Sequence, residues 1–228
     1  MYFTHLTPSY FVVVGPFILL SIWASWRVRS TFTRFSTVGV LSGMTGAQAA
    51  AAVARAGGAI VTIERHQGFL SDHYDPRSKT LRLSPEVHDG RSISAIAVAA
   101  HEAGHSLQDV KHYAWLGFRS KLVPVTSFGS NTWMWVFLAG IVLNWPVLAN
   151  VGILLFAVVV LFQLVTLPVE FDASNRAKLV LAQSGIVANE AEKQGVSKVL
   201  GAAAMTYVAA ALTSVATLVY YIFLRRRN

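Results

Sequence analysis

Residues 150–167, NVGILLFAVVVLFQLVTL, decide the fold of this chain. The stretch has no charged side chain and nearly reaches the roughly 20 residues that a helix needs to cross a bilayer. Three other stretches have the same character. The sequence therefore predicts four transmembrane helices: Tyr10–Trp26, Thr126–Leu143, Asn150–Leu167 and Thr206–Leu224. NWPVLAN separates the second stretch from the third, so these two are expected to form a hairpin.

The composition also indicates a membrane protein. Hydrophobic residues make up 54% of the 228 residues and charged residues 13%, whereas a soluble domain has about 25% charged residues. The absence of cysteine excludes a disulfide framework, a cysteine nucleophile and thiolate-bound zinc. A net charge of +8 on so apolar a chain indicates contact with anionic lipid headgroups, and no basic–aromatic surface indicates nucleic acid. The predicted location is the cell membrane.

The predicted fold class is mainly α, a multi-pass membrane protein with a small α+β region. The first apolar stretch is interpreted as a retained anchor, because basic residues follow it and no cleavage site is evident. The expected divisions are residues 1–30 (anchor), 31–125 (polar α+β region), 126–168 (transmembrane hairpin), 169–200 (polar helical segment) and 201–228 (C-terminal transmembrane helix and basic tail).

Within the α+β region, Thr45 is expected to cap a helix that ends at Gly57 and Gly58. Alternating residues then predict three short strands, with a turn at residues 75–78 between the second and the third. These strands are Ala59–Arg65, Gly68–Tyr74 and Lys79–Leu83. A second helix is predicted from about Ser92 to Asp109.

That second helix contains His101-Glu102-Ala103-Gly104-His105, an HExxH pattern. Residues four apart lie on one helix face, so both imidazoles can reach one zinc ion. Glu102 is then placed beside the metal, where it can act as a general base. The alternative is a histidine pair on a polar helix face. The preceding run, SISAIAVAA, is apolar and indicates burial, and buried polar groups need partners.

Glu170 is the predicted third ligand, because an acid at the end of an apolar span is a candidate functional residue. The alternative is an acid that complements the dipole at the start of a helix. Glu190 and Glu192 are expected on a solvated helix face, and Asp109 beside the site. Two predicted spans separate His105 from Glu170, so both halves of the site lie on one side of the membrane.

The segments HEAGHSLQ, DHYDP and VEF resemble the bacterial neutral zinc metallopeptidases of the membrane, the YugP-like family, and more distantly the HtpX-type membrane proteases. The resemblance implies one zinc ion per chain on His101, His105 and Glu170, with Glu102 as catalytic base. In the distant relatives an aspartate follows the third ligand by four residues, where this chain has Ser174. An acid that orients a zinc histidine is therefore expected elsewhere, at Asp172 or Asp109.

The predicted function is a membrane-embedded zinc endopeptidase that acts on a peptide or membrane-protein substrate, with Glu102 taking the proton of a zinc-activated water. The alternatives are a catalytically silent, zinc-stabilised membrane scaffold and a metal transporter. The zinc site is expected on the cytoplasmic side. Candidates for a further donor to the developing oxyanion are His112, Tyr113, Arg176 and Tyr207.

Overall fold

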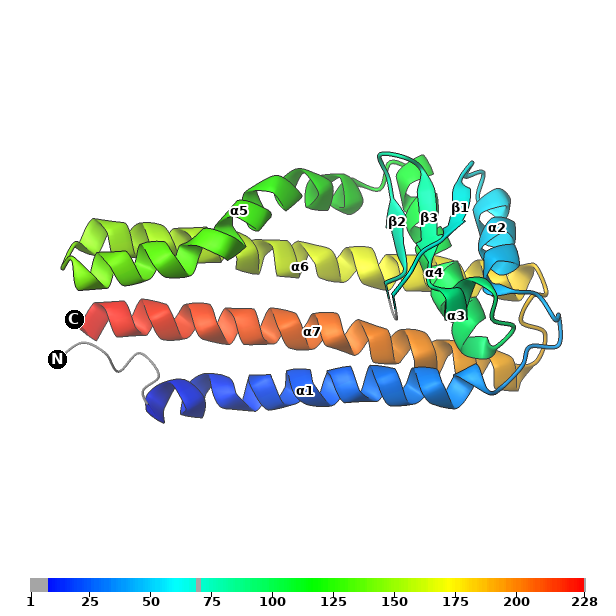
Figure 1. Ribbon diagram of the computed structural model, residues 1–228, viewed down its shortest axis with the longest axis horizontal. Helices are drawn as coiled ribbons and strands as arrows, with labels where there is room; N and C mark the ends of the chain where they lie inside the picture. Colours follow the sequence, from blue (N-terminus) through cyan, green and yellow to red (C-terminus); the bar gives the residue numbers. More distant parts are fainter. Residues whose placement is uncertain (1–7, 69–70, 228) are drawn as a thin grey trace. The chain divides into compact units, whose positions relative to one another are not determined.

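The computed structural model describes residues 8–68 and 71–227 and contains two compact units (Figure 1). The membrane unit comprises described residues 8–24, 118–167 and 206–227, and the polar unit comprises 25–68, 71–117 and 168–205. The described helices are α1 (Pro8–Ser36), α2 (Gly46–Ala56), α3 (Pro85–His88), α4 (Ile93–Val110), α5 (Ala114–Val142), α6 (Pro146–Gln183) and α7 (Glu190–Arg227). The strands are β1 (Thr62–Arg65), β2 (His73–Asp75) and β3 (Thr80–Leu83).

Three of the four predicted spans lie in helices long and apolar enough to cross a membrane. Among the described residues these helices are α1, α6 and α7, and α5 is not one of them. The polar, uncharged residues Thr126, Ser127, Ser130 and Asn131 lower the mean hydropathy of α5. Ser130 and Asn131 donate hydrogen bonds to the carbonyl of Ser127, so the helix itself satisfies these side chains.

In the membrane unit, α5 and α6 form a tightly packed hairpin. A Cβ atom added to Gly140 would lie 2.3 Å from the backbone nitrogen of Ala149, and one added to Gly152 would lie 2.6 Å from that of Phe137. Glycine therefore lets the two backbones meet, and Phe137 between them is only 1% exposed. This contact agrees with the hairpin that the sequence predicts.

The predicted helix after Thr45 is confirmed as α2. The Thr45 hydroxyl accepts from the Gln48 amide, and the Gln48 side chain accepts from the Thr45 amide, which forms a capping box. The alanine-rich face of α2 is buried, and Gly57 at its end lies against Leu107 of α4. Apolar packing between α2 and α4 thus forms part of the core of the polar unit.

The sheet has the order β1-β3-β2, as Figure 1 shows. The predicted turn is confirmed: the Asp75 carboxylate accepts from the Arg77 amide and the Ser78 hydroxyl, and β2 pairs antiparallel with β3. The strands are shorter than predicted, and β1 pairs with β3 in parallel. Residues 69 and 70 of the second predicted strand lie outside the described residues.

The predicted HExxH helix is confirmed as α4, with the Ser92 hydroxyl accepting from the Ala95 amide at its start. The second polar segment consists of the end of α6 and the start of α7. Pro168 lies inside a helix, because α6 runs from Pro146 to Gln183 through this proline, so Glu170 does not stand at a helix start. An apolar stretch and Glu170 therefore belong to one continuous helix.

The predicted solvated position of Glu192 is also wrong. Glu192 is 4% exposed, and its carboxylate accepts hydrogen bonds from the backbone amides of Leu41 and Ala188. This acid thus joins the loop after α1 to the loop before α7. Glu190 is exposed, as expected.

Candidate metal centre

His101 and His105 from α4 meet Glu170 from α6 inside the polar unit. The Nε2 atom of His101 lies 3.1 Å from Oε2 of Glu170, and the Nε2 atom of His105 lies 3.6 Å from the same oxygen. One potential ligand atom from each residue lies within 4.8 Å of the others. Glu170 is 2% exposed. Two imidazoles and one buried carboxylate fit a divalent cation, and they form a donor set typical of catalytic zinc.

A close approach of the two backbones brings these residues together. A Cβ atom added to Gly104 would lie 2.5 Å from the carbonyl oxygen of Ala173. Gly104 lies between the two histidines in sequence, and Ala173 lies three residues after Glu170. The missing side chain of Gly104 therefore lets α4 reach α6 at the level of the three polar residues.

The Nδ1 atoms of both histidines have hydrogen-bond partners. Nδ1 of His101 lies 3.0 Å from the hydroxyl of Ser174, and Nδ1 of His105 lies 3.0 Å from Oε1 of Gln108. The expected acid is therefore absent from both described contacts. The Ser174 hydroxyl contacts His101 directly. Asp172 contacts neither histidine in these hydrogen bonds but accepts one from Gln108, the residue beside His105 Nδ1.

Asp109 lies one turn beyond His105 and belongs to a different cluster. Its Oδ2 atom accepts from the Tyr74 hydroxyl at 2.7 Å and from the Lys79 amine at 2.5 Å. Both partners lie beside the turn of the β2–β3 hairpin, so Asp109 fastens this hairpin to the end of α4. Burial and the hydrogen bond to Asp109 raise the pKa of Tyr74.

Glu102 lies beside the first histidine in sequence and is buried. Burial raises the pKa of its carboxyl group, because the charged form loses its hydration. A buried acid with a raised pKa next to a candidate metal-binding cluster can exchange a proton with a nearby water or amine.

Two of the suggested oxyanion donors contact each other. The guanidinium of Arg176 lies 5.6 Å from the ring centre of Tyr113, and its Nε atom donates to Asp172 at 2.5 Å. Tyr207 belongs to the membrane unit. Gln108 was missed by sequence reasoning, although its position three residues after His105 is a helix spacing that permits contact.

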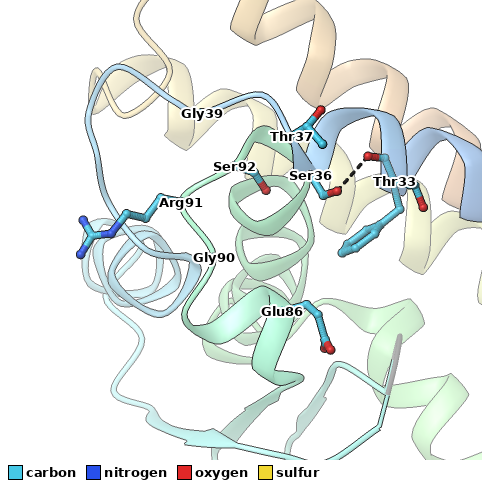
Figure 2. A pocket seen from close by; sticks show the side chains of 9 residues that line it. Thr33, Ser36, Thr37, Gly39, Glu86, Gly90, Arg91 and Ser92 are labelled. Atoms are coloured by element: carbon cyan, nitrogen blue, oxygen red, sulfur yellow. Dashed lines mark hydrogen bonds between the residues drawn. The ribbon is translucent and has the colours of Figure 1, made fainter.

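The polar unit also has a surface hollow of about 560 Å³ at the N-terminal end of α4. Its lining includes Thr33, Ser36, Glu86 and Arg91 and none of the three residues His101, His105 and Glu170. In Figure 2, Arg91 extends away from the hollow, and it donates a hydrogen bond to the carbonyl of Gly43. The two charged side chains do not converge, so the hollow offers no comparable donor set.

An HExxH helix that meets a glutamate from a second helix is typical of zinc metallopeptidases. The chain belongs to the family described as "Putative neutral zinc metallopeptidase", whose sequence profile matches residues 10–226. A curated relative, "Putative membrane protease YugP" of Bacillus subtilis (strain 168), is 47% identical over 212 residues, which cover 92% of this chain and 94% of the relative. No solved structure matches the chain significantly. The resemblance to the YugP-like family is thus confirmed, and the family implies zinc.

Proposed function

We infer that this chain is a zinc-dependent endopeptidase of the cell membrane. The observation that carries the proposal is the convergence of two histidines of an HExxH helix on one buried carboxylate oxygen of Glu170. In this proposal His101, His105 and Glu170 hold one zinc ion. The zinc ion, when bound, supplies a Lewis acid that lowers the pKa of a water molecule and polarises the scissile carbonyl.

Glu102 is the proposed general base. Its buried carboxylate accepts a proton from the attacking water and then donates it to the amine that leaves. The raised pKa suits this exchange, because a group that both takes and returns a proton works best when its pKa lies near the operating pH. Ser174 and Gln108 hold the two imidazoles in place during this cycle.

The proposed substrate is a peptide or membrane-protein segment in an extended conformation. Strand β2 contacts α4 and, within the described residues, pairs only with β3. In this proposal an extended chain adds to the other edge of β2 through backbone hydrogen bonds. Asp109 supports this arrangement, because it anchors Tyr74 of β2 to the helix that carries the histidines.

The proposed membrane arrangement has four crossings. Three are α1, α6 and α7, and the later half of α5 is added to them. The tight hairpin between α5 and α6 supports this, because α6 is itself long and apolar enough to cross. The proposal keeps the five segments expected from the sequence, which end at residues 30, 125, 168, 200 and 228. The zinc site is placed on the cytoplasmic side, where most of the basic residues near the spans would then lie.

The rival functions lead to different expectations. A catalytically silent, zinc-stabilised scaffold needs no acid at position 102. A transporter places its metal ligands inside its spans, whereas both histidines of this chain lie on α4, which is not a candidate span. The test is hydrolysis of a fluorogenic peptide library by the full-length chain in detergent micelles. Activity that a chelator abolishes and zinc restores supports the peptidase, and zinc binding without hydrolysis of any library member favours the scaffold.

A further inference from the structure

Gln108 is 0% exposed, and both ends of its side-chain amide have partners. Its Oε1 atom lies 3.0 Å from Nδ1 of His105. Its Nε2 atom donates to the backbone carbonyl of Val169 at 2.7 Å and to Oδ2 of Asp172 at 2.8 Å. Val169 directly precedes Glu170, so one side chain on α4 contacts the second histidine and the backbone beside the glutamate.

These partners determine which way the Gln108 amide points. The carbonyl of Val169 and the carboxylate of Asp172 only accept hydrogen bonds, so the amide NH₂ group must face them. The carboxylate of Asp172 is held by Arg176, whose Nε atom donates to the same oxygen at 2.5 Å. The amide oxygen of Gln108 must then face His105.

The direction of the amide in turn determines the tautomer of His105. An amide oxygen accepts but cannot donate, so Nδ1 of His105 must carry the proton. The lone pair of a neutral imidazole is then on Nε2, the atom that faces Glu170. His101 is different, because the Ser174 hydroxyl beside its Nδ1 can either donate or accept and therefore permits both tautomers.

We propose that Gln108 is a positioning residue that locks His105 in the tautomer whose Nε2 is free to bind zinc, and that it fastens α4 to α6 beside Glu170. The chain of hydrogen bonds runs from Arg176 through Asp172 and Gln108 to His105. An uncharged amide thus accepts the hydrogen bond from the histidine Nδ1 that a carboxylate accepts in many zinc sites. The identity of the metal as zinc rests on the proposed function. The tautomer of His105 does not, because it follows from the hydrogen bonds of Gln108.

Three variants of the full-length chain test it, with zinc affinity measured by competition with a chromophoric chelator. Gln108→Met keeps the volume but removes the acceptor, and it is expected to weaken zinc binding about 10–100-fold, as outer partners of zinc histidines typically do. Gln108→Glu restores an acceptor for Nδ1, so it should bind zinc nearly as well as wild type, even though the added charge beside Asp172 lowers stability. Ser106→Ala is the matched control, because it removes a buried hydrogen bond to Ala103 from the same helix without touching a histidine.

A second readout uses the metal-free protein. The ¹⁵N chemical shifts of His105, recorded at a pH high enough to keep the imidazole neutral beside the Glu170 carboxylate, should show protonation at Nδ1 alone in wild type and a mixture of tautomers in Gln108→Met. Equal losses of zinc affinity in Gln108→Met and Gln108→Glu, or an Nε2-protonated His105 in wild type, would overturn the proposal. If Gln108→Met does not fold, the wild-type ¹⁵N shifts decide. A wild-type chain that has the expected tautomer but binds no zinc would contradict the proposed function, but it would still support the role of Gln108 in fixing the tautomer of His105.

Discussion

The Nε2 atom of His101 lies 3.1 Å from Oε2 of Glu170, although 69 positions separate the two residues in sequence. The charge of an isolated buried carboxylate is costly, so Glu170 needs a positive partner or a metal ion. Two imidazole nitrogens face one of its oxygens. A divalent cation among the three would satisfy the carboxylate and use the lone pairs of both rings.

Loss of a ligand should remove the metal. We expect about one zinc ion per purified wild-type chain and much less in His101→Ala, His105→Ala and Glu170→Ala, as a site with three protein ligands requires. Elemental analysis after gel filtration measures the ratio. Glu190→Ala is the control, because Glu190 is an exposed acid on α7. Full zinc occupancy in Glu170→Ala would remove Glu170 from the ligand set.

Glu102→Gln should keep zinc and lose hydrolysis. The amide has the shape of the carboxylate but cannot accept the proton of water, and general base catalysis contributes about 10²–10⁴-fold to a rate. The measurement is the initial rate of peptide cleavage by protein of verified zinc content. Undiminished turnover in the zinc-loaded variant would assign the base to another residue.

Gly104→Ala should destabilise the protein and weaken zinc binding. The added methyl group would meet the carbonyl of Ala173 at 2.5 Å, so α4 and α6 would have to separate. Overpacking of this kind typically costs about 1–3 kcal/mol. Gly201→Ala is the control, since nothing lies within 4 Å of the added atom and alanine favours a helix. Thermal unfolding in detergent compares the two, and equal midpoints would contradict the close approach.

Glu192→Gln should lower stability without changing zinc affinity. One of the amides of Leu41 and Ala188 would lose its acceptor and face an NH₂ group instead. An unsatisfied buried donor costs about 1–3 kcal/mol. Glu190→Gln, made two residues away at an exposed position, should change the free energy of unfolding little. The same cost in both variants would indicate that Glu192 is not anchored as described.

The zinc site should face the cytoplasm. With the N-terminus outside and four crossings, ten basic residues near the spans lie inside: Arg27, Arg29, Arg34, Lys111, Arg119, Lys121, Arg176, Lys178, Lys193 and Lys198. Three, Arg225, Arg226 and Arg227, lie outside.

Single cysteines test this topology, because the chain has none of its own. Cysteines at Asn150 and Asn228 should react with an impermeant reagent in intact cells, and one at Ser78 should not. Labelling at Ser78 would place the site on the external face. Protection at Asn150 would show that α5 does not cross.

Sequence reasoning predicted the features that depend on neighbouring residues. The Thr45 cap, the turn at residues 75–78 and the His101–His105 pair each follow from a local spacing, and the structure contains all three. Glu170 could be singled out because an acid after an apolar run is unusual.

The remaining features depend on contacts between distant segments. Glu192 resembles an ordinary surface acid in sequence, and only its contact with Leu41 shows that it is buried. The parallel pairing of β1 with β3 likewise depends on how a helix and a hairpin pack. Gln108 is three residues from His105, but its role follows from Val169 and Asp172 on another helix.

Glu170 follows both helices of the α5–α6 hairpin in the chain, whereas both histidines precede it. During synthesis the histidine pair therefore emerges well before the residue that completes its ligand set. A chain that fails to place this hairpin correctly leaves the histidine pair without Glu170. If the chain is the peptidase proposed above, correct placement of this hairpin is a condition that must be met before the chain can hydrolyse a peptide.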